Sequence, residues 1–101
     1  MSGAPSQPRW LRDARRRYGR ARRAGHAAYV IADVQLAYAY ALQAHLPRCA
    51  RVGDAAGLAL TDCIQLLEDA VQGQAPVAVV AEQIDALDEE IVFIEVCLDA
   101  R

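Results

Sequence analysis

The chain has 101 residues, of which 54% are hydrophobic, and it carries a formal net charge of −2. A chain of this length fits one domain with one modest core, which leaves little room for a deep active-site pocket. Much of the hydrophobic content is alanine, and the six glycines and four prolines are few for a β-rich protein. We therefore predict an all-α fold.

The charges are segregated along the chain. Eight of the eleven arginines lie in residues 9–23, where Asp13 is the single acid, so this stretch carries a formal charge of +7. Eleven of the thirteen acids lie in residues 54–101, against Arg101 alone, so that stretch carries −10. The small net charge therefore conceals a large dipole, which is the strongest functional clue in the sequence.

Residues 1–8 are predicted to form a disordered tail, because Ser, Gly and two prolines offer nothing to bury. A single helical-bundle domain is predicted over residues 9–101. It opens with a basic amphipathic helix over residues 9–23, in which apolar residues recur at helical spacing and arginines fill the other faces. Gly19 and Gly25 are expected to interrupt or hinge this helix.

Residues 26–46 contain a single charge, Asp33, and are apolar on nearly all sides, which is typical of a central helix. The arginine cluster before this segment would suit a membrane anchor, but the polar residues and the high alanine content of residues 26–46 disfavour insertion into a bilayer. No membrane partner is therefore expected. A buried Asp33 would need a cation, and Arg20, Arg22 or Arg23 of the preceding segment is predicted to supply it.

Residues 47–53 are predicted to form a connection that starts at Pro47, and Asp54 is predicted to cap the next helix. That helix is expected to follow Asp54 and to stop at Gly73. Its apolar stripe comprises Leu60, Cys63, Ile64, Leu67 and Val71.

The last predicted helix opens near Pro76 and runs to the C-terminus, with acidic residues opposite its apolar seam. The seam residues recur alternately three and four apart, as an unbroken heptad pattern: Val77, Val80, Ile84, Leu87, Ile91, Ile94 and Leu98. Val92, Phe93 and Val96 widen the apolar face in the C-terminal half. This widening predicts contacts on more than one side, in a bundle core or in a dimer seam.

Short connections predict a small antiparallel helical bundle of three core helices, to which the arginine-rich N-terminal helix is added. That first helix has three alternative places: along the acidic last helix, as an extension of the second helix, or on a different molecule. The second helix is too apolar to be covered in a three-helix monomer, which indicates either the fourth helix or a homodimer. We favour the homodimer.

The charged segments supply the candidate contact residues. Contacts with a partner or with phosphate are assigned to Arg9, Arg12, Arg15, Arg16, Arg17, Arg20, Arg22, Arg23, Trp10 and Tyr18. An acidic partner surface is assigned to Asp85, Asp88, Glu89, Glu90 and Glu95. The favoured interpretation is that the arginines pair with acidic protein surface, of this chain or of a partner. The alternatives are nucleic acid, with bases stacking on the two aromatic rings, and a merely solvated face.

We therefore expect a non-enzymatic protein-interaction module of adaptor, small-chaperone or inhibitor type. The alternative is a nucleic-acid-associated regulator that binds phosphates through residues 9–23. The strongly acidic remainder of the chain counts against the alternative, because it repels a phosphate backbone.

The sequence indicates no catalytic residue, metal site or cofactor. Cys49, Cys63 and Cys97 form no CxxC pair and no secretory leader is recognised, so we expect reduced thiols and a cytoplasmic protein. Cys63 and Cys97 are expected to be small buried hydrophobes, and Cys49 to be exposed. His45 lies four residues before Cys49, but Pro47 intervenes and two ligands do not close a metal site.

The run from Ile84 to Ile91 (IDALDEEI) resembles the opening helix of AroQ-type chorismate mutases, and equally the coiled-coil helix that closes many MerR-type regulators. The mutases need arginines on this helix, and residues 77–100 contain none. No helix-turn-helix module precedes the run, as one does in the regulators. No activity or site residue is therefore carried over from either family.

Overall fold

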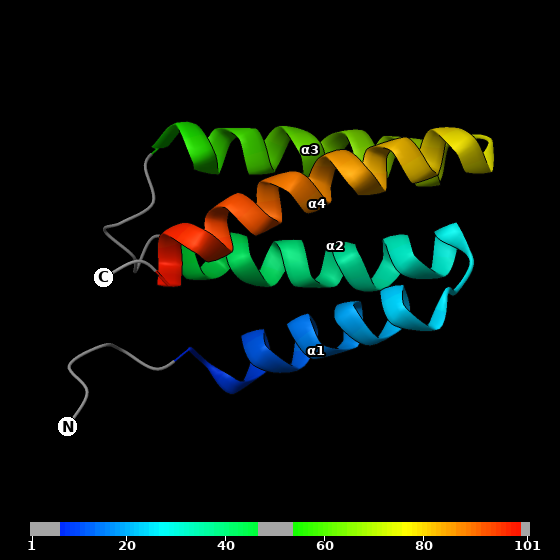
Figure 1. Cartoon of the computed structure of the whole chain (residues 1–101). Helices are drawn as coiled ribbons and strands as arrows, with labels where there is room; N and C mark the ends of the chain where they lie inside the picture. Colours follow the sequence, from blue (N-terminus) through cyan, green and yellow to red (C-terminus); the bar gives the residue numbers. More distant parts are fainter. Residues whose placement is uncertain (1–6, 47–53, 100–101) are drawn as a thin grey trace, which may run out of the picture.

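The computed structural model describes residues 7–46 and 54–99, and within them it contains α-helices and no strand. The elements in chain order are α1 (Arg9–Ala24), α2 (Ala28–His45), α3 (Asp54–Gln72) and α4 (Val77–Asp99). Successive helices run in opposite directions, and α4 crosses α2 and α3 obliquely (Figure 1). The prediction of an all-α antiparallel bundle is confirmed.

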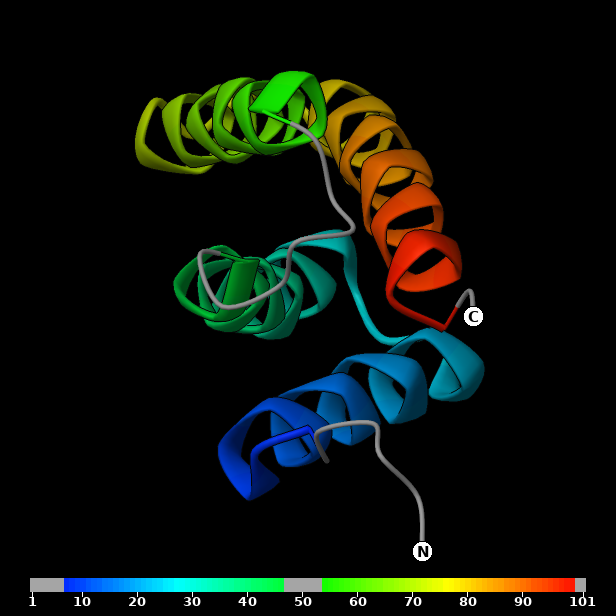
Figure 2. The same ribbon diagram turned by 90° about the vertical axis from the view of Figure 1, so that its left-hand side faces the viewer.

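Helix α2 is the central element of the bundle. It packs against α1, α3 and α4, and α3 and α4 pack against each other. The view along the helices shows α2 between α1 on one side and the α3–α4 pair on the other (Figure 2). The apolar second segment is thus covered on most sides within the chain, because α1 folds back along it, while Val30 and Tyr40 remain exposed.

The core consists of the predicted stripes of α3 and α4 together with small and aromatic residues of α2. The buried members are Leu60, Ile64 and Leu67 of α3, Val80, Ile84, Leu87, Ile91 and Ile94 of α4, and Ala32, Tyr38, Ala39 and Leu42 of α2. Val77 was predicted to belong to the seam, but its side chain is 62% exposed. It is the first residue of α4 and lies at the end of the bundle, where no neighbouring turn covers it.

Cys63 and Cys97 are half-buried rather than fully buried as predicted. Cys63 lies at the margin of the α3–α4 interface, where burial and then the negative charges of Glu90, Asp62 and Glu89 raise the pKa of its thiol. A raised thiol pKa keeps the side chain neutral, so Cys63 acts as a small apolar group at this margin.

Gly25 ends α1 in the way its sequence position predicts. Its φ of 70° is in the left-handed region, its N–H donates to the Arg22 carbonyl, and the His26 N–H donates to the Ala21 carbonyl. Helix α3 ends at Gln72, so Gly73 follows its last residue as predicted, and the left-handed residue is Gln74, with φ 53°. The Ala75 N–H then donates to the Ala70 carbonyl and satisfies the end of the helix.

Helix α1 passes through Gly19 without a break, so the predicted hinge at this residue is wrong. The helix is held on both sides of the glycine, because Tyr18 and Ala21 are buried against the bundle. Burial of these neighbours outweighs the conformational freedom of one glycine.

Several predictions from the sequence fall outside the described residues. Residues 1–6 of the predicted tail, the connection over residues 47–53 and Cys49 within it are among them, as is the side chain of Asp54. Of the predicted tail, Pro8 is described, and its carbonyl accepts hydrogen bonds from the N–H groups of Leu11 and Arg12 at the start of α1.

None of the described helices combines the length with the apolar character that a bilayer crossing requires.

The two glycines of α1 are expected to respond to alanine in opposite directions. Gly19→Ala should raise the free energy of unfolding by about 0.5–1 kcal/mol, since a Cβ there meets only the flexible end of Arg23. Gly25→Ala should lower it by about 1 kcal/mol, because an L side chain is strained in the left-handed region. Urea denaturation of both variants measures this, and a loss of stability in Gly19→Ala would contradict the continuous helix.

Candidate functional site

Helix α1 is amphipathic, and its apolar side faces the bundle. Leu11, Tyr18 and Ala21 are buried, whereas all eight arginines between Arg9 and Arg23 are exposed. Seven and three residues separate these buried positions, so they share one face of the helix, and the arginines occupy the rest of its circumference. Packing of this face on α2 therefore presents a dense arginine surface on the outside of the molecule.

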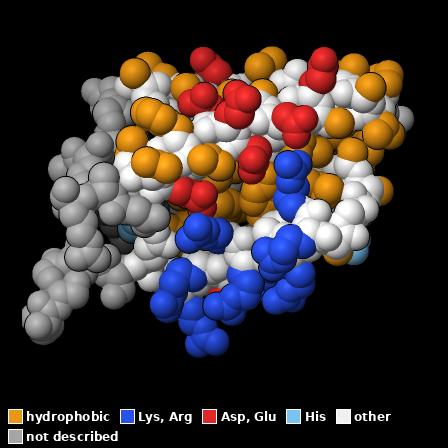
Figure 3. Space-filling view, viewed as in Figure 1, with side chains coloured by type: hydrophobic (Ala, Val, Ile, Leu, Met, Phe, Trp, Pro, Cys, Tyr) orange, Lys and Arg blue, Asp and Glu red, His pale blue; other side chains and the backbone are white. Residues whose placement is uncertain are grey.

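Part of that arginine surface meets the acidic side of α4. Arg15 Nε lies 2.9 Å from Glu95 Oε2, and Arg22 Nη1 lies 3.6 Å from Asp85 Oδ1. The space-filling view shows the arginine side chains of α1 opposite acidic side chains of α4, across a hollow in the surface (Figure 3). The arginine-rich helix packs along α2 and reaches the acidic side of α4 through these side-chain pairs, so none of its three predicted places describes its main packing partner.

A buried tyrosine joins the same two helices. The Tyr18 hydroxyl donates to Asp88 Oδ1 at 2.6 Å and accepts a hydrogen bond from Gln35 Nε2 at 2.9 Å. Gln35 Nε2 also donates to the Ile84 carbonyl at 2.8 Å. Burial and then the Asp88 carboxylate raise the pKa of Tyr18 well above its ordinary value of 10, so the hydroxyl stays a proton donor.

A second tyrosine makes a similar bond about two turns further along α4. The Tyr38 hydroxyl donates to Glu95 Oε2, which also accepts Arg15. The rings of Tyr18 and Tyr38 lie with their centroids 6.1 Å apart and tilted by 34°. Glu95 therefore joins an α1 arginine and an α2 tyrosine to α4, and the two rings form part of the floor between α1 and α4.

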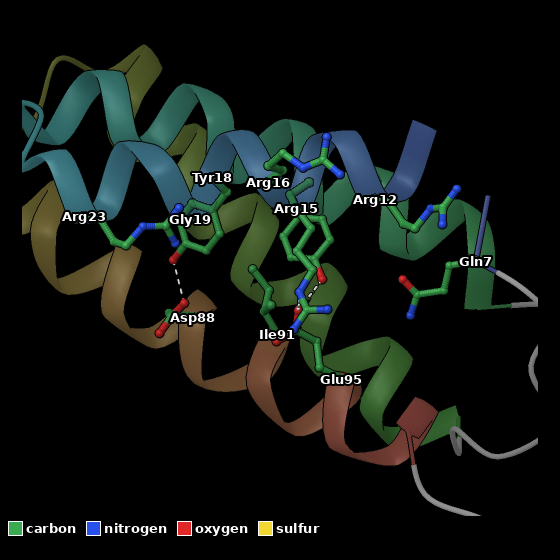
Figure 4. A pocket seen from close by; sticks show the side chains of 11 residues that line it. Gln7, Arg12, Arg15, Arg16, Tyr18, Gly19, Arg23, Asp88, Ile91 and Glu95 are labelled. Atoms are coloured by element: carbon green, nitrogen blue, oxygen red, sulfur yellow. Dashed lines mark hydrogen bonds and ion pairs between the residues drawn. The ribbon is translucent and has the colours of Figure 1, made fainter. Parts of the chain in front are cut away.

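These contacts border an open cavity of about 530 Å³, which we call the α1–α4 groove. Its lining comprises Gln7, Arg12, Arg15, Arg16, Tyr18, Gly19, Arg23, Tyr38, Asp88, Ile91 and Glu95. In the close view Arg15 points toward Glu95 and Tyr18 toward Asp88, while Gln7 with Arg12 and Arg23 with Gly19 lie toward opposite ends (Figure 4). The α1–α4 groove thus has an arginine wall, an acidic wall and an aromatic floor.

The predicted arginine contacts fall into three groups. Arg15 and Arg22 bridge to α4, and Arg9 and Arg16 approach Asp13 of their own helix at 3.8 and 3.9 Å. The other four, Arg12, Arg17, Arg20 and Arg23, form no ion pair with any residue that the structure describes. These four keep their hydrogen-bond donors available to solvent or to a partner.

The two predicted aromatic contacts differ in access. Trp10 is 48% exposed on α1, so its ring is available to a partner. Tyr18 is buried and fully hydrogen-bonded, so its ring face cannot stack on a nucleic-acid base without unfolding the contact with α4.

The predicted acidic surface is divided between the chain's own α1 and the solvent. Three of its residues contact α1 of the same chain: Asp85 pairs with Arg22, Asp88 accepts a hydrogen bond from Tyr18, and Glu95 pairs with Arg15. Glu89 is exposed and Glu90 half-buried, and no ion pair joins either to another described residue.

Asp33 does not have the role predicted for it. The residue is exposed on α2, and among the described residues no arginine forms an ion pair with it. Because α1 covers the opposite side of α2, Asp33 remains in water and needs no partner.

Sequence reasoning missed the buried polar residue of the interface, Gln35. It occupies a seam position of α2, three residues after Ala32 and seven before Leu42, both of which are buried. A polar residue at such a position is the signal that could have identified it. Its Oε1 atom is buried and has no hydrogen-bond partner among the described residues.

No group of histidine, cysteine and acidic side chains within the described residues could hold a metal ion. Comparison of the chain with protein-family models, with curated proteins and with solved structures gave no match. The functional inference therefore rests on the residues of the chain and on their arrangement.

Tyr18→Phe should lower the free energy of unfolding by about 1–2 kcal/mol at neutral pH, because the phenylalanine loses bonds to Asp88 and Gln35. The raised pKa of Tyr18 means that folding favours its neutral form. The stabilisation that the Tyr18 hydroxyl gives to the folded state is thus complete below about pH 10 and declines as the pH rises further. The free energy of unfolding of Tyr18→Phe should therefore fall less in alkali than that of the wild type.

Urea denaturation between pH 7 and 11 measures both effects. Tyr40→Phe is the matched control, because the Tyr40 hydroxyl donates to Glu68 on an exposed surface. This substitution should change the free energy of unfolding by less than about 0.5 kcal/mol. Equal effects of the two substitutions would contradict the role given to Tyr18.

Proposed function

We propose that this protein is a non-enzymatic helical interaction module of adaptor, small-chaperone or inhibitor type that works as a homodimer. The observation that carries the proposal is a cluster of large apolar side chains exposed on α4. Val92, Phe93 and Val96 are 49%, 55% and 62% exposed. Because Val96 follows Val92 by four residues and Phe93 by three, both adjoin it on the helix surface. We call them the α4 patch.

The α4 patch lies where the sequence predicted a widened apolar face. Hydrophobic side chains gather over the C-terminal half of α4 in the space-filling view (Figure 3). Isolated apolar residues are ordinary on a protein surface, but adjoining ones mark a contact site. The bundle core is no explanation for these residues, since the chain's own helices leave them uncovered.

A second copy of the chain is the partner that suits the α4 patch best. In a two-fold dimer the same patch meets itself, which covers all three side chains on both copies. An antiparallel crossing centred on Phe93 places the α4 patch of one copy against the same patch of the other.

Helix α1 covers much of α2, so the apolar second segment needs a second copy less than its sequence predicts. The α4 patch has no such cover from the described helices. Dimerisation through α4 leaves the arginine side of α1 available for a further protein, whose contact surface should be acidic. We place this function in the cytoplasm, because three cysteines without a CxxC pair suit a reducing compartment.

Val96→Glu should convert the dimer to a monomer, because it buries a charge without a partner in the centre of the interface. The matched control is Val77→Glu, which lies on the same helix, has the same 62% exposure and is remote from the α4 patch. Sedimentation equilibrium of the wild type and both variants measures the mass. A monomeric wild type, or equal effects of the two substitutions, would contradict the proposal.

A nucleic-acid-associated regulator is the second candidate, and it is favoured by the arginine residues that face away from α4. Arg17 and Arg20 are exposed, have no ion pair with a described residue and do not line the α1–α4 groove. Trp10, seven residues before Arg17, shares their side of α1 and offers a ring for stacking. The acidic α4 lies on the other side of the helix.

If this candidate is right, a labelled single-stranded RNA or DNA should bind with an affinity that falls steeply as salt is raised. Arg17→Gln combined with Arg20→Gln should then reduce the slope of log K against log salt by roughly 2, since each phosphate contact contributes about 1. Fluorescence anisotropy at low and physiological salt measures this. Absence of binding even at low salt would exclude the candidate and leave the protein-interaction module.

A further inference from the structure

The arginine wall of the α1–α4 groove has a regular spacing. Arg12, Arg16, Gly19 and Arg23 follow one another at intervals of three or four residues and line the groove from one side of α1. Gly19 contributes no side chain, so the wall is open between Arg16 and Arg23. A Cβ at Gly19 would lie 3.2 Å from Arg23 Nη1, within the space that the groove occupies.

The α1–α4 groove has an excess of positive charge. Four arginines and two carboxylates line it. Glu95 pairs with Arg15 and accepts a hydrogen bond from Tyr38. Asp88 accepts a hydrogen bond from Tyr18. Arg12 and Arg23 therefore retain guanidinium groups without a carboxylate among the described residues. The ligand that complements this lining is an anion.

The length of the arginine wall excludes a small anion as the complete ligand. At 1.5 Å per residue, Arg12 and Arg23 lie about 16 Å apart along α1. A single carboxylate or phosphate can reach one of them but not both. The occupant is therefore an extended molecule with several negative groups.

The length of the α1–α4 groove suits an extended chain. At about 3.3 Å per residue, about five residues of an extended peptide span the arginine wall.

We propose that the α1–α4 groove binds an extended acidic segment of a partner protein, a proposal that rests on the protein being an interaction module. In an extended chain alternate side chains point to opposite sides. Acidic side chains two residues apart lie about 6.6 Å apart, which matches the spacing of about 6 Å between Arg12 and Arg16. The intervening apolar side chains then face Tyr38 and Ile91 on the floor.

The acidic wall decides between a peptide and a nucleic acid. Asp88 and Glu95 face the arginines across the α1–α4 groove and are half-buried. A nucleic-acid strand carries charge on every nucleotide, so it would bring phosphates close to these carboxylates. A peptide avoids this repulsion, because it places acids on one side and apolar groups on the other.

The probe for the test is a fluorescein-labelled peptide in which glutamate alternates with leucine over seven residues. It should bind the full-length wild-type protein, and the same peptide with glutamine in place of glutamate should not. Arg12→Gln combined with Arg23→Gln should weaken binding roughly tenfold, the loss expected for two partly exposed ion pairs. Arg17→Gln combined with Arg20→Gln removes the same charge from the same helix outside the groove, and should change binding less than about twofold.

Equal weakening by the two double variants would overturn the proposal, because it would mean that the overall charge of α1 and not the α1–α4 groove binds the peptide. Absence of binding by the wild type would overturn it as well. Displacement of the peptide by a single-stranded RNA at lower concentration than by unlabelled peptide would assign the groove to nucleic acid instead. Sedimentation equilibrium on the same samples reports the dimer separately, so failure of the groove and failure of the α4 patch are distinguishable.

Discussion

The packing of α1 on the central helix α2, together with its polar contacts to the acidic side of α4, is the constraint on which the rest of this structure depends. Without α1, the apolar α2 would lack cover on one side. Tyr18 supplies the buried link, because its ring packs in the core and its hydroxyl bonds Asp88. The surface pairs Arg15–Glu95 and Arg22–Asp85 add charge complementarity on either side of it. Exposed pairs contribute little free energy, so they fix the orientation of α1 more than its stability.

This attachment uses only part of the available charge. Two of the eight arginines of α1 bridge to α4, and four have no carboxylate partner among the described residues. The reason is geometric, since a helix presents arginines around most of its circumference and α4 approaches from one direction. The remaining charge is divided between the α1–α4 groove and the side that carries Trp10. Two binding surfaces of different character thus arise from one arginine-rich segment.

The positions of the core residues followed from helical periodicity, but the site did not. Heptad spacing identified Ile84, Leu87 and Ile91 as core, because burial of a stripe is a local property of one helix. The partner of Tyr18 could not be found in this way, since Asp88 is seventy residues away in the chain. Gly19 and Asp33 were misjudged for a related reason: whether a helix bends, or a carboxylate is buried, depends on what packs against it.

The sequence by itself determined the helices, the apolar stripes and the separation of charge, because all three are set by residue type and by spacing within a segment. It also placed Val92, Phe93 and Val96 on a widened apolar face. Only the tertiary structure decided which arginines are neutralised, which tyrosine is buried and where the groove opens. These outcomes depend on the direction from which α4 approaches α1, and contacts between distant segments set that direction.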